Sequence, residues 1–231
     1  MTPVRDESGR KWDAIYRQRN RDAPPPPPWV LHAHRQLLPD TGRALDIACG
    51  TGGGALFLAQ RGLRTTACDI SGEAIKRLRH LAGSRGLEIR MLVCDAAAAL
   101  AQPRRYDVIT VSRYLDRGLM PLIARACKDR GLVYYQTFAG AAGPKAHPRN
   151  PLYRLGRNEL LHFFLAQDFE ILSYREAPDG DEAMRDQACL VARRRGQRAA
   201  NSPANRGRPG AEKPADRRPP RSKQSGSRNC I

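Results

Sequence analysis

Four glycines and three aspartates of this chain have the types and the spacing to bind a small molecule. The glycines are Gly50, Gly52, Gly53 and Gly54, and the aspartates are Asp46, Asp69 and Asp95. Glycine lets the backbone turn tightly and approach a ligand closely, and the free N–H groups at the start of a following helix point toward that ligand. The glycines therefore predict a nucleotide-binding loop, and the carboxylates bear on which nucleotide cofactor it holds.

Alternating strands and helices position these residues. Arg43–Cys49 is a short, nearly continuous apolar run, typical of a strand buried on both faces of a parallel sheet. Further strands are expected at Leu63–Asp69, Leu87–Cys94, Tyr106–Ser112 and Gly131–Phe138, with helices at Ala55–Gln60, Ile70–Ser84, Ala96–Ala101, Leu119–Lys128 and Asn158–Ala166, the last capped by Asn158.

The final strands, Phe169–Glu176 and Gln187–Arg193, have no helix-length segment between them, so they should pair antiparallel at the sheet edge. The strands before them alternate with helices, as in right-handed βαβ units. We therefore expect an α/β fold: a Rossmann-like three-layer sandwich with a mostly parallel seven-stranded sheet and an antiparallel C-terminal hairpin.

The segment before the first strand has its own pattern. Trp12, Ile15 and Tyr16 share one face of a predicted helix, Lys11–Asn20, which should bury both rings against the core or cover the ligand cleft. A stiff polyproline spacer, Pro24–Pro28, and a helix at Trp29–Leu38 follow.

The glycine pattern alone leaves the cofactor open. Gly50 to Ala55 satisfies GxGxxG/A, the dinucleotide fingerprint, so an NAD-type oxidoreductase is one alternative. A dinucleotide pyrophosphate, however, would be repelled by Asp46, which lies four residues before the first glycine. S-adenosylmethionine has no phosphate and carries a sulfonium and an ammonium group, so a carboxylate near the loop favours it.

Three motifs strengthen that preference: LDIACGTG, CDIS and VCDA, followed by a closing hairpin. With them the chain resembles the class I S-adenosylmethionine-dependent methyltransferases over about residues 10 to 193. Within that class, WDAIYR and LYRLGRNELLHFF leading to FEILSYRE are loosely similar to the tellurite-resistance and thiopurine-type enzymes. We therefore expect residues 1–40 to cap the cofactor cleft and residues 41–193 to form a methyltransferase domain. The composition of residues 194–231, which has almost no large apolar side chains, predicts a disordered basic tail.

The resemblance also implies roles for individual residues. Asp46 and Gly50 would lie by the methionine moiety, with Gly52 allowing a close backbone approach, and Ala48 would also belong to the cofactor-binding set. Asp69 would accept both ribose hydroxyls and Ile70 would pack on the adenine. The cofactor set is completed by Asp95 and Ala96 at the adenine edge and Ser112 near the transferable methyl group. Capping of a helix or turn is the structural alternative for Asp69 and Asp95.

The end of the fourth strand reads Ser112-Arg113-Tyr114-Leu115. It is not the Asn/Asp-Pro-Pro-Tyr/Phe sequence of amino-group DNA methyltransferases, and no Pro-Cys nucleophile for pyrimidine C5 methylation occurs in the chain. We expect in-line methyl transfer to a small acceptor, anionic or soft (sulfur, selenium or tellurium), with Arg113 and Tyr114 as the catalytic candidates.

Further side chains could serve the acceptor. His147, His162, Tyr114 and Tyr153 are candidate bases, although a surface or core-edge role suits each of them better. Arginines in the segments after the fourth and fifth strands could bind an anionic substrate: Arg113, Arg117, Arg149 and Arg154.

The charge and the cysteine content limit the remaining functional classes. From Arg193 onward twelve Lys or Arg face two acids, so +10 of the net +17 lies in the tail and +7 in the rest. The tail leaves open an RNA-associated methyltransferase or an RNA-binding module. The six cysteines lack CxxC spacing, so we expect neither a metal site nor a disulfide framework. Without a signal-peptide core or an apolar run of about 18 residues, a cytoplasmic location is expected.

Overall fold

The computed structural model describes residues 3–18, 24–142, 148–176 and 186–196. The predicted basic tail lies almost wholly outside the described residues, and so does His147. None of the described helices is long and apolar enough to cross a membrane.

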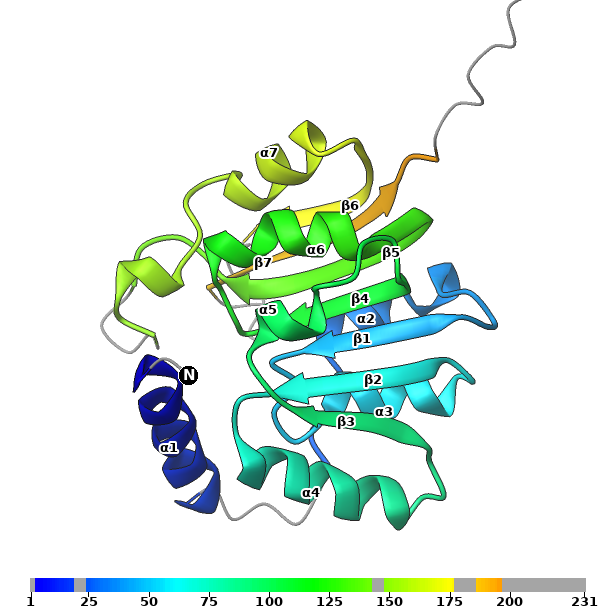
Figure 1. Cartoon of the computed structure of the whole chain (residues 1–231). Coiled ribbons are helices and arrows are strands. Elements are labelled where there is room, and N and C mark those ends of the chain that lie inside the picture. The colour runs from blue at the N-terminus through cyan, green and yellow to red at the C-terminus, as the bar shows by residue number, and fades with distance from the viewer. Residues whose placement is uncertain (1–2, 19–23, 143–147, 177–185, 197–231) are drawn as a thin grey trace, which may run out of the picture. The chain divides into compact units, whose positions relative to one another are not determined.

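A seven-stranded sheet forms the centre, in the order β3-β2-β1-β4-β5-β7-β6 (Figure 1). The strands are β1 (Arg43–Ile47), β2 (Arg64–Asp69), β3 (Ile89–Val93), β4 (Tyr106–Ser112), β5 (Cys127–Phe138), β6 (Phe169–Glu176) and β7 (Gln187–Arg194). The first five are parallel to one another, while β7 runs antiparallel to both β5 and β6. The expected fold class, including the C-terminal hairpin, is confirmed.

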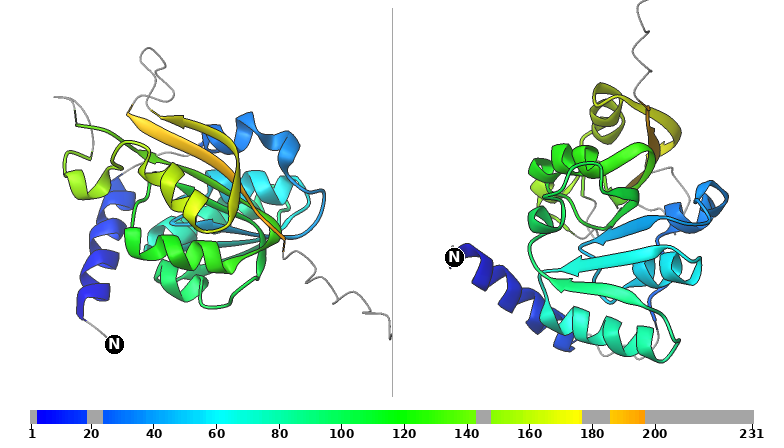
Figure 2. Two further views of the ribbon diagram at one scale, coloured as in Figure 1. Left: turned by 90° about the horizontal axis from the view of Figure 1, so that it is seen from above. Right: turned by 45° about the vertical axis from the view of Figure 1, so that its right-hand side comes forward.

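Helices cover both faces of the sheet (Figure 2). They are α1 (Pro3–Gln18), α2 (Trp29–Ala33), α3 (Gly53–Gln60), α4 (Gly72–Gly83), α5 (Ala96–Ala99), α6 (Met120–Ala126) and α7 (Glu159–Ala166), with short 3-10 turns at Arg35–Leu37, Arg117–Leu119 and Pro151–Tyr153. The apolar residues of α2, α3 and α4 pack on one face, and those of α6 and α7 pack on the other.

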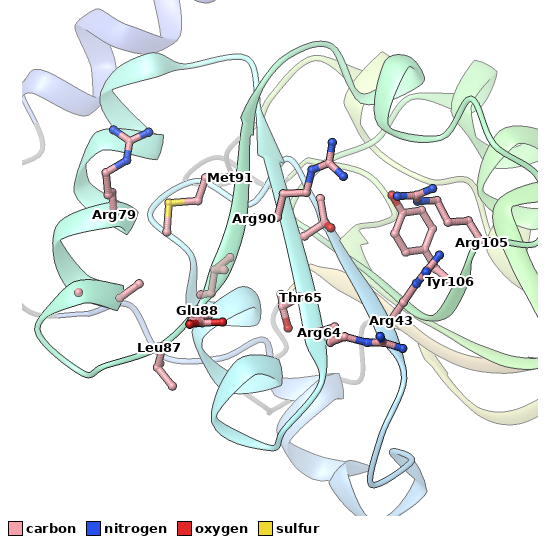
Figure 3. Close-up of a pocket in the computed structure, with 14 residues that line it drawn as sticks. Arg43, Arg64, Thr65, Arg79, Leu87, Glu88, Arg90, Met91, Arg105 and Tyr106 are labelled. Carbon is pink, nitrogen blue, oxygen red and sulfur yellow. The ribbon is translucent and has the colours of Figure 1, made fainter.

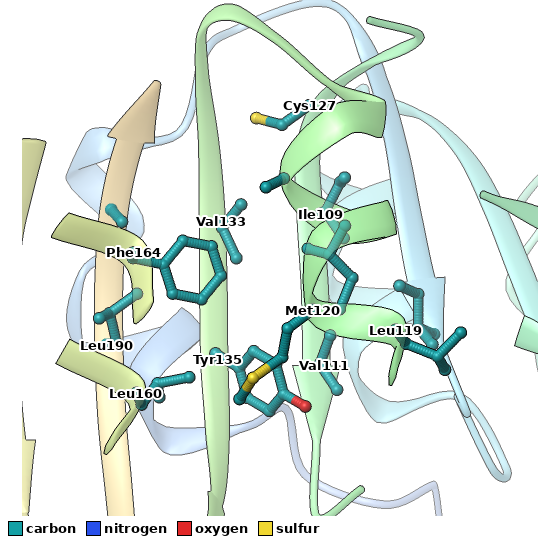
Figure 4. Packing of buried hydrophobic residues seen from close by; sticks show 14 of the residues in the cluster. Ile109, Val111, Leu119, Met120, Cys127, Val133, Tyr135, Leu160, Phe164 and Leu190 are labelled. Atoms are coloured by element: carbon teal, nitrogen blue, oxygen red, sulfur yellow. The ribbon is translucent and has the colours of Figure 1, made fainter. Parts of the chain in front are cut away.

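The largest cluster of buried apolar side chains lies between α6, α7 and the middle of the sheet. In Figure 4, Ile109 and Val111 of β4 and Val133 of β5 face Met120 and Phe164 from the helices. Burying side chains of this size on both faces is what makes β1, β4 and β5 read as continuous apolar runs.

Several expected details differ from the structure. Helix α1, for example, begins at Pro3 and not at Lys11. β5 begins at Cys127, not at Gly131, because the polar residues Lys128 and Asp129 extend the strand through ion pairs with Asp107 and Arg104 at 2.8 and 2.7 Å. Asn158, expected as a helix cap, has a positive φ and makes no side-chain capping hydrogen bond.

Candidate functional site

The glycine loop connects β1 to α3 at the carboxyl end of the sheet. Gly50 and Gly52 both have positive φ, which a residue with a side chain adopts only at a cost. At Gly52 a Cβ atom would lie 2.2 Å from Leu78, and at Gly53 it would lie 2.4 Å from the carbonyl oxygen of Pro26. The missing side chains therefore let α4 and the proline spacer pack against the loop. The close approach of a cofactor at Gly52 stays a prediction.

Asp46 lies under this loop, and its carboxylate is 2 % exposed. Its Oδ2 accepts the Ala55 N–H at 2.7 Å, in the first turn of α3, and packs where a Cβ of Gly54 would be. Burial, together with the nearby charge of Asp69, raises the pKa of Asp46 to about 7, although the Ala55 hydrogen bond opposes the shift. A cation beside this carboxyl group would favour its ionised form.

Asp69, at the end of β2, organises the other side of the loop. Its Oδ2 accepts the Gly50 N–H at 2.8 Å and its Oδ1 accepts the Ser71 N–H at 2.9 Å. The side chain is 7 % exposed, and burial raises its pKa despite these hydrogen bonds. Each carboxylate oxygen has a second lone pair, so both retain capacity to accept a ligand hydroxyl.

The remaining cofactor candidates lie at the carboxyl ends of β1, β2, β3 and β4. Ala48 has a positive φ and is half-buried, and Ile70 follows Asp69 directly, half-buried next to Gly9 of α1. Asp95 is exposed and caps α5 by accepting the Ala97 N–H at 2.8 Å, which is the structural alternative stated for it. Ala96 and Ser112 are half-buried at the carboxyl ends of β3 and β4.

Helix α1 contacts the loop region. Figure 1 shows it beyond the arrowheads of β1, β2 and β3. A Cβ on Gly50 would lie 2.6 Å from the Tyr16 hydroxyl oxygen, so the ring covers this glycine. Trp12, in contrast, is 39 % exposed, and the expectation that it is buried in the core is wrong. Its neighbours on α1 reach α4 instead, because the helix packs at the edge of the sheet and not on it.

Sequence reasoning missed the residue that holds α1 in place. Asp13 Oδ1 accepts the Ser71 hydroxyl at 2.6 Å and the Glu73 N–H at 3.1 Å, while Ser71 Oγ accepts the Ala74 N–H as the cap of α4. Ser71 and Glu73 are recognisable as helix-start residues, but nothing in the sequence indicates that residue 13 meets them.

The acceptor-side candidates separate into two groups. Arg113 is exposed at the end of β4 with a positive φ, and Arg149 is exposed in the segment after β5. Two other arginines have structural bonds in place of the expected substrate role. Arg117 forms a two-point pair with Glu159 at 2.6 and 2.9 Å. Arg154 is 3 % exposed and donates to several backbone carbonyls between residues 139 and 148.

The candidate bases have weak support. Tyr114 is half-buried, and burial, with Asp116 and Asp95 nearby, raises its pKa, so it remains a phenol that donates hydrogen bonds. His162, in α7, and Tyr153, in the 3-10 turn before it, are exposed. No group of three or more metal-ligating side chains occurs among the described residues.

This geometry has counterparts in known proteins. A family model described as a methyltransferase domain matches residues 44–131, from β1 into β5, and includes the loop and all three aspartates. That stretch is a methyltransferase domain of class I. It decides the cofactor question that the glycine pattern had left open, because the family and the fold imply S-adenosyl-L-methionine.

Two relatives carry methyltransferase names. A ubiquinone biosynthesis O-methyltransferase of Stutzerimonas stutzeri is 34 % identical over 113 residues, which are 46 % of this chain and 47 % of the relative. A demethylmenaquinone methyltransferase of Thermus thermophilus is 36 % identical over 72 residues, 30 % of this chain and 33 % of the relative. The chain thus spans about half the length of the curated relatives it matches.

Solved structures agree on the fold. TehB from Haemophilus influenzae superposes with a TM-score of 0.57 at 22 % identity, covering 72 % of this chain and 61 % of TehB. An S-adenosylmethionine-dependent methyltransferase from Methanosarcina mazei gives 0.57 at 19 % identity, covering 71 % and 97 %. At these identities the likeness shows the fold alone, and the looser subfamily resemblance stays a prediction.

Proposed function

We propose that this protein transfers a methyl group from S-adenosylmethionine to a small acceptor that is anionic or soft. The observation that carries the proposal is the buried pair of carboxylates, Asp46 and Asp69, on either side of the glycine loop. Neither forms an ion pair with a cationic side chain of the described residues, and burial raises the pKa of both. This site therefore suits a cationic, hydroxyl-bearing ligand better than a pyrophosphate.

The residues of the chain would align the reaction. When bound, S-adenosylmethionine supplies an electrophilic methyl group on a sulfonium. Asp69 would hold the ribose hydroxyls, Asp46 would balance positive charge, and α1 with Tyr16 would exclude water. Methyl transfer from a sulfonium is an in-line displacement with a neutral leaving group, so alignment is the main requirement.

The side chains that follow β4 suit a methyl acceptor that does not need a strong base. Tyr114 remains protonated near neutral pH, whereas Arg113 offers an exposed guanidinium at the end of β4. A thiolate or a chalcogen oxyanion requires only positioning, and a guanidinium binds oxyanions through two parallel hydrogen bonds.

The name of one group of relatives supports a second acceptor class. The name ubiquinone biosynthesis O-methyltransferase says that those relatives methylate an oxygen atom. The family model, however, matches the stretch that carries the cofactor residues, so the shared sequence bears on the cofactor more than on the acceptor.

A two-part experiment tests the function. Calorimetry with S-adenosylhomocysteine and with NADH should show binding of the first only; the reverse result would overturn the assignment. A labelled methyl-transfer screen over thiols, selenite and tellurite, carboxylates, phenols and RNA then identifies the acceptor class.

With the best anionic acceptor in hand, Arg113→Ala and Arg149→Ala should raise its KM several-fold, while the exposed control Arg157→Ala should leave KM unchanged. Equal KM values for all three variants would remove the anionic-acceptor proposal and leave the cofactor assignment intact.

A further inference from the structure

The methyltransferase domain has a concave site away from the glycine loop. A hollow of about 790 Å3 lies at the amino ends of β1, β2 and β3 (Figure 3). Its charged lining is Arg43, Arg64, Arg79, Arg90 and Arg105, together with one acid, Glu88. We call it the arginine hollow. β1 begins at Arg43 and runs toward the glycine loop, so about 13 Å of strand separates the two sites.

The strand register gathers several of these arginines on one face of the sheet. Arg43 of β1 pairs with Arg64 of β2, and Arg90 of β3 pairs with Thr66. Thr66 lies two residues after Arg64, and residues two apart on a strand point to the same face. Arg43, Arg64 and Arg90 therefore share a face across three adjacent strands, and Arg105 directly precedes the fourth.

This face of the sheet is open because the helix between β3 and β4, α5, is too short to cover it. α5 has four residues and begins right after Asp95, at the carboxyl ends of the strands. At 1.5 Å per residue it is about 6 Å long, against about 16 Å for β3. In Figure 1, β2 and β3 have no described helix in front of them. The amino halves of these strands thus stay uncovered, and Arg90 is exposed on β3, at the edge of the sheet.

The charges of the hollow are not balanced within the described part of the chain. Arg64, Arg79 and Arg90 form no ion pair with any described residue and are exposed. Arg43 lies near Asp107, whose carboxylate already pairs with Lys128 at 2.8 Å. Arg105 lies over the ring of Tyr106, 5.7 Å from its centroid. Like charges that line one hollow repel one another, and an anionic partner would offset that repulsion.

We propose that the arginine hollow binds the phosphate backbone of a nucleic-acid strand. Guanidinium groups bind phosphate through two parallel hydrogen bonds. From β3 to β4 the arginines span three strand spacings, about 14 Å, which is wider than one phosphate group. Tyr106 is 3 % exposed, so the lining presents no open aromatic face to a base. Contacts of this kind position a backbone without reading sequence.

The binding uses residues of the folded domain and does not depend on methyl transfer. The bound nucleic acid would lie at the opposite end of β1 from the glycine loop. It is therefore not the methyl acceptor of the site at that loop. It differs, too, from an RNA contact made by the basic tail, because the charges are fixed on the sheet.

The test measures binding of fluorescent 12-nucleotide RNA and DNA to the full chain by anisotropy, between 0.05 and 0.3 M KCl. Arg64→Gln with Arg90→Gln removes two charges from the hollow, and the control, Arg125→Gln with Arg157→Gln, removes two exposed charges elsewhere. The tail is the same in both, so its contribution cancels.

For a single strand, each lost phosphate contact lowers the slope of log K against log salt by about 0.7. The hollow variant should therefore bind about 25-fold more weakly than the control at 0.1 M salt, with a slope smaller by about 1.4. Arg64→Lys with Arg90→Lys should restore most of the slope, which separates lost charge from lost fold.

Preference for RNA or for DNA identifies the source of the phosphates, and either preference supports the proposal. Three results overturn it: no binding by the unaltered chain, equal weakening in the hollow and control variants, or equally tight binding of a 12-residue polyglutamate, which would assign the hollow to an acidic protein.

Discussion

At the scale of single residues, the two buried aspartates differ from the exposed one. Asp46 and Asp69 are buried and accept hydrogen bonds from backbone N–H groups of the loop and of the helix starts, whereas Asp95 lies on the surface as a helix cap. The same residue type, predicted for the same cofactor, therefore has different energetics at each position. Two predictions follow from this difference.

The first concerns pH. The folded-state pKa of Asp46, about 7, lies above the usual value of 3.8. Between those values the folded chain binds a proton that the unfolded chain does not, so stability falls as pH rises through this range. We expect Asp46→Asn to remove a slope of about 1.4 kcal/mol per pH unit between pH 5 and 6.5. Urea unfolding at several pH values measures it, and parallel curves for the two proteins would contradict the assignment.

The second concerns Asp69 and Asp95. Asp69→Ala leaves the buried N–H groups of Gly50 and Ser71 without acceptors, so it should lower the free energy of unfolding by about 2–4 kcal/mol. Asp95→Ala removes one exposed cap and should cost about 1 kcal/mol. Both should weaken S-adenosylhomocysteine binding more than tenfold in calorimetry. Unchanged affinity in either variant would remove that residue from the cofactor site.

At the scale of elements, Asp13 joins α1 to the start of α4. It accepts hydrogen bonds from Ser71 and Glu73, while the ion pair of Arg17 with Glu73 at 3.4 Å joins exposed groups. Exposed pairs of that kind contribute about 0.2–1 kcal/mol, so we expect the two hydrogen bonds of Asp13 to matter more than this ion pair.

We expect Asp13→Ala to loosen α1. Loss of its two hydrogen bonds should raise hydrogen exchange in residues 7–18 about tenfold, since each net bond contributes about 0.5–1.5 kcal/mol. Glu7→Ala, at an exposed position of the same helix, serves as the control and should leave exchange unchanged. Mass spectrometry of peptides from this helix measures both. If S-adenosylhomocysteine slows the exchange in the unaltered protein, α1 also covers the bound cofactor.

At the scale of the whole domain, the parallel sheet places an acidic, glycine-rich site and an arginine-rich site at opposite ends of the same strands. Acids and glycines gather where β1 and β2 end, and arginines gather where β1 and β2 begin. The separation arises because parallel strands bring all their carboxyl ends to one edge of the sheet and all their amino ends to the other.

The sequence by itself determined the fold class and the cofactor loop. Apolar runs of five to seven residues, such as Tyr106–Ser112, specify buried strands, and an acid within such a run, Asp46, demands a partner. Both signals come from residues that are neighbours in the chain. The glycine signal is also local, because the conformation of a backbone turn depends on the residues that form it.

Only the tertiary structure decided which distant residues meet. The sequence pattern predicted Arg117 and Arg154 as substrate ligands. In the structure they bind Glu159 and the backbone after β5. Asp13 meets Ser71 across 58 positions, and Arg43, Arg64 and Arg90 share one open face of the sheet because of strand register and a short α5. Such contacts arise from packing and register, which depend on the whole sheet at once and leave no mark on any one stretch of sequence.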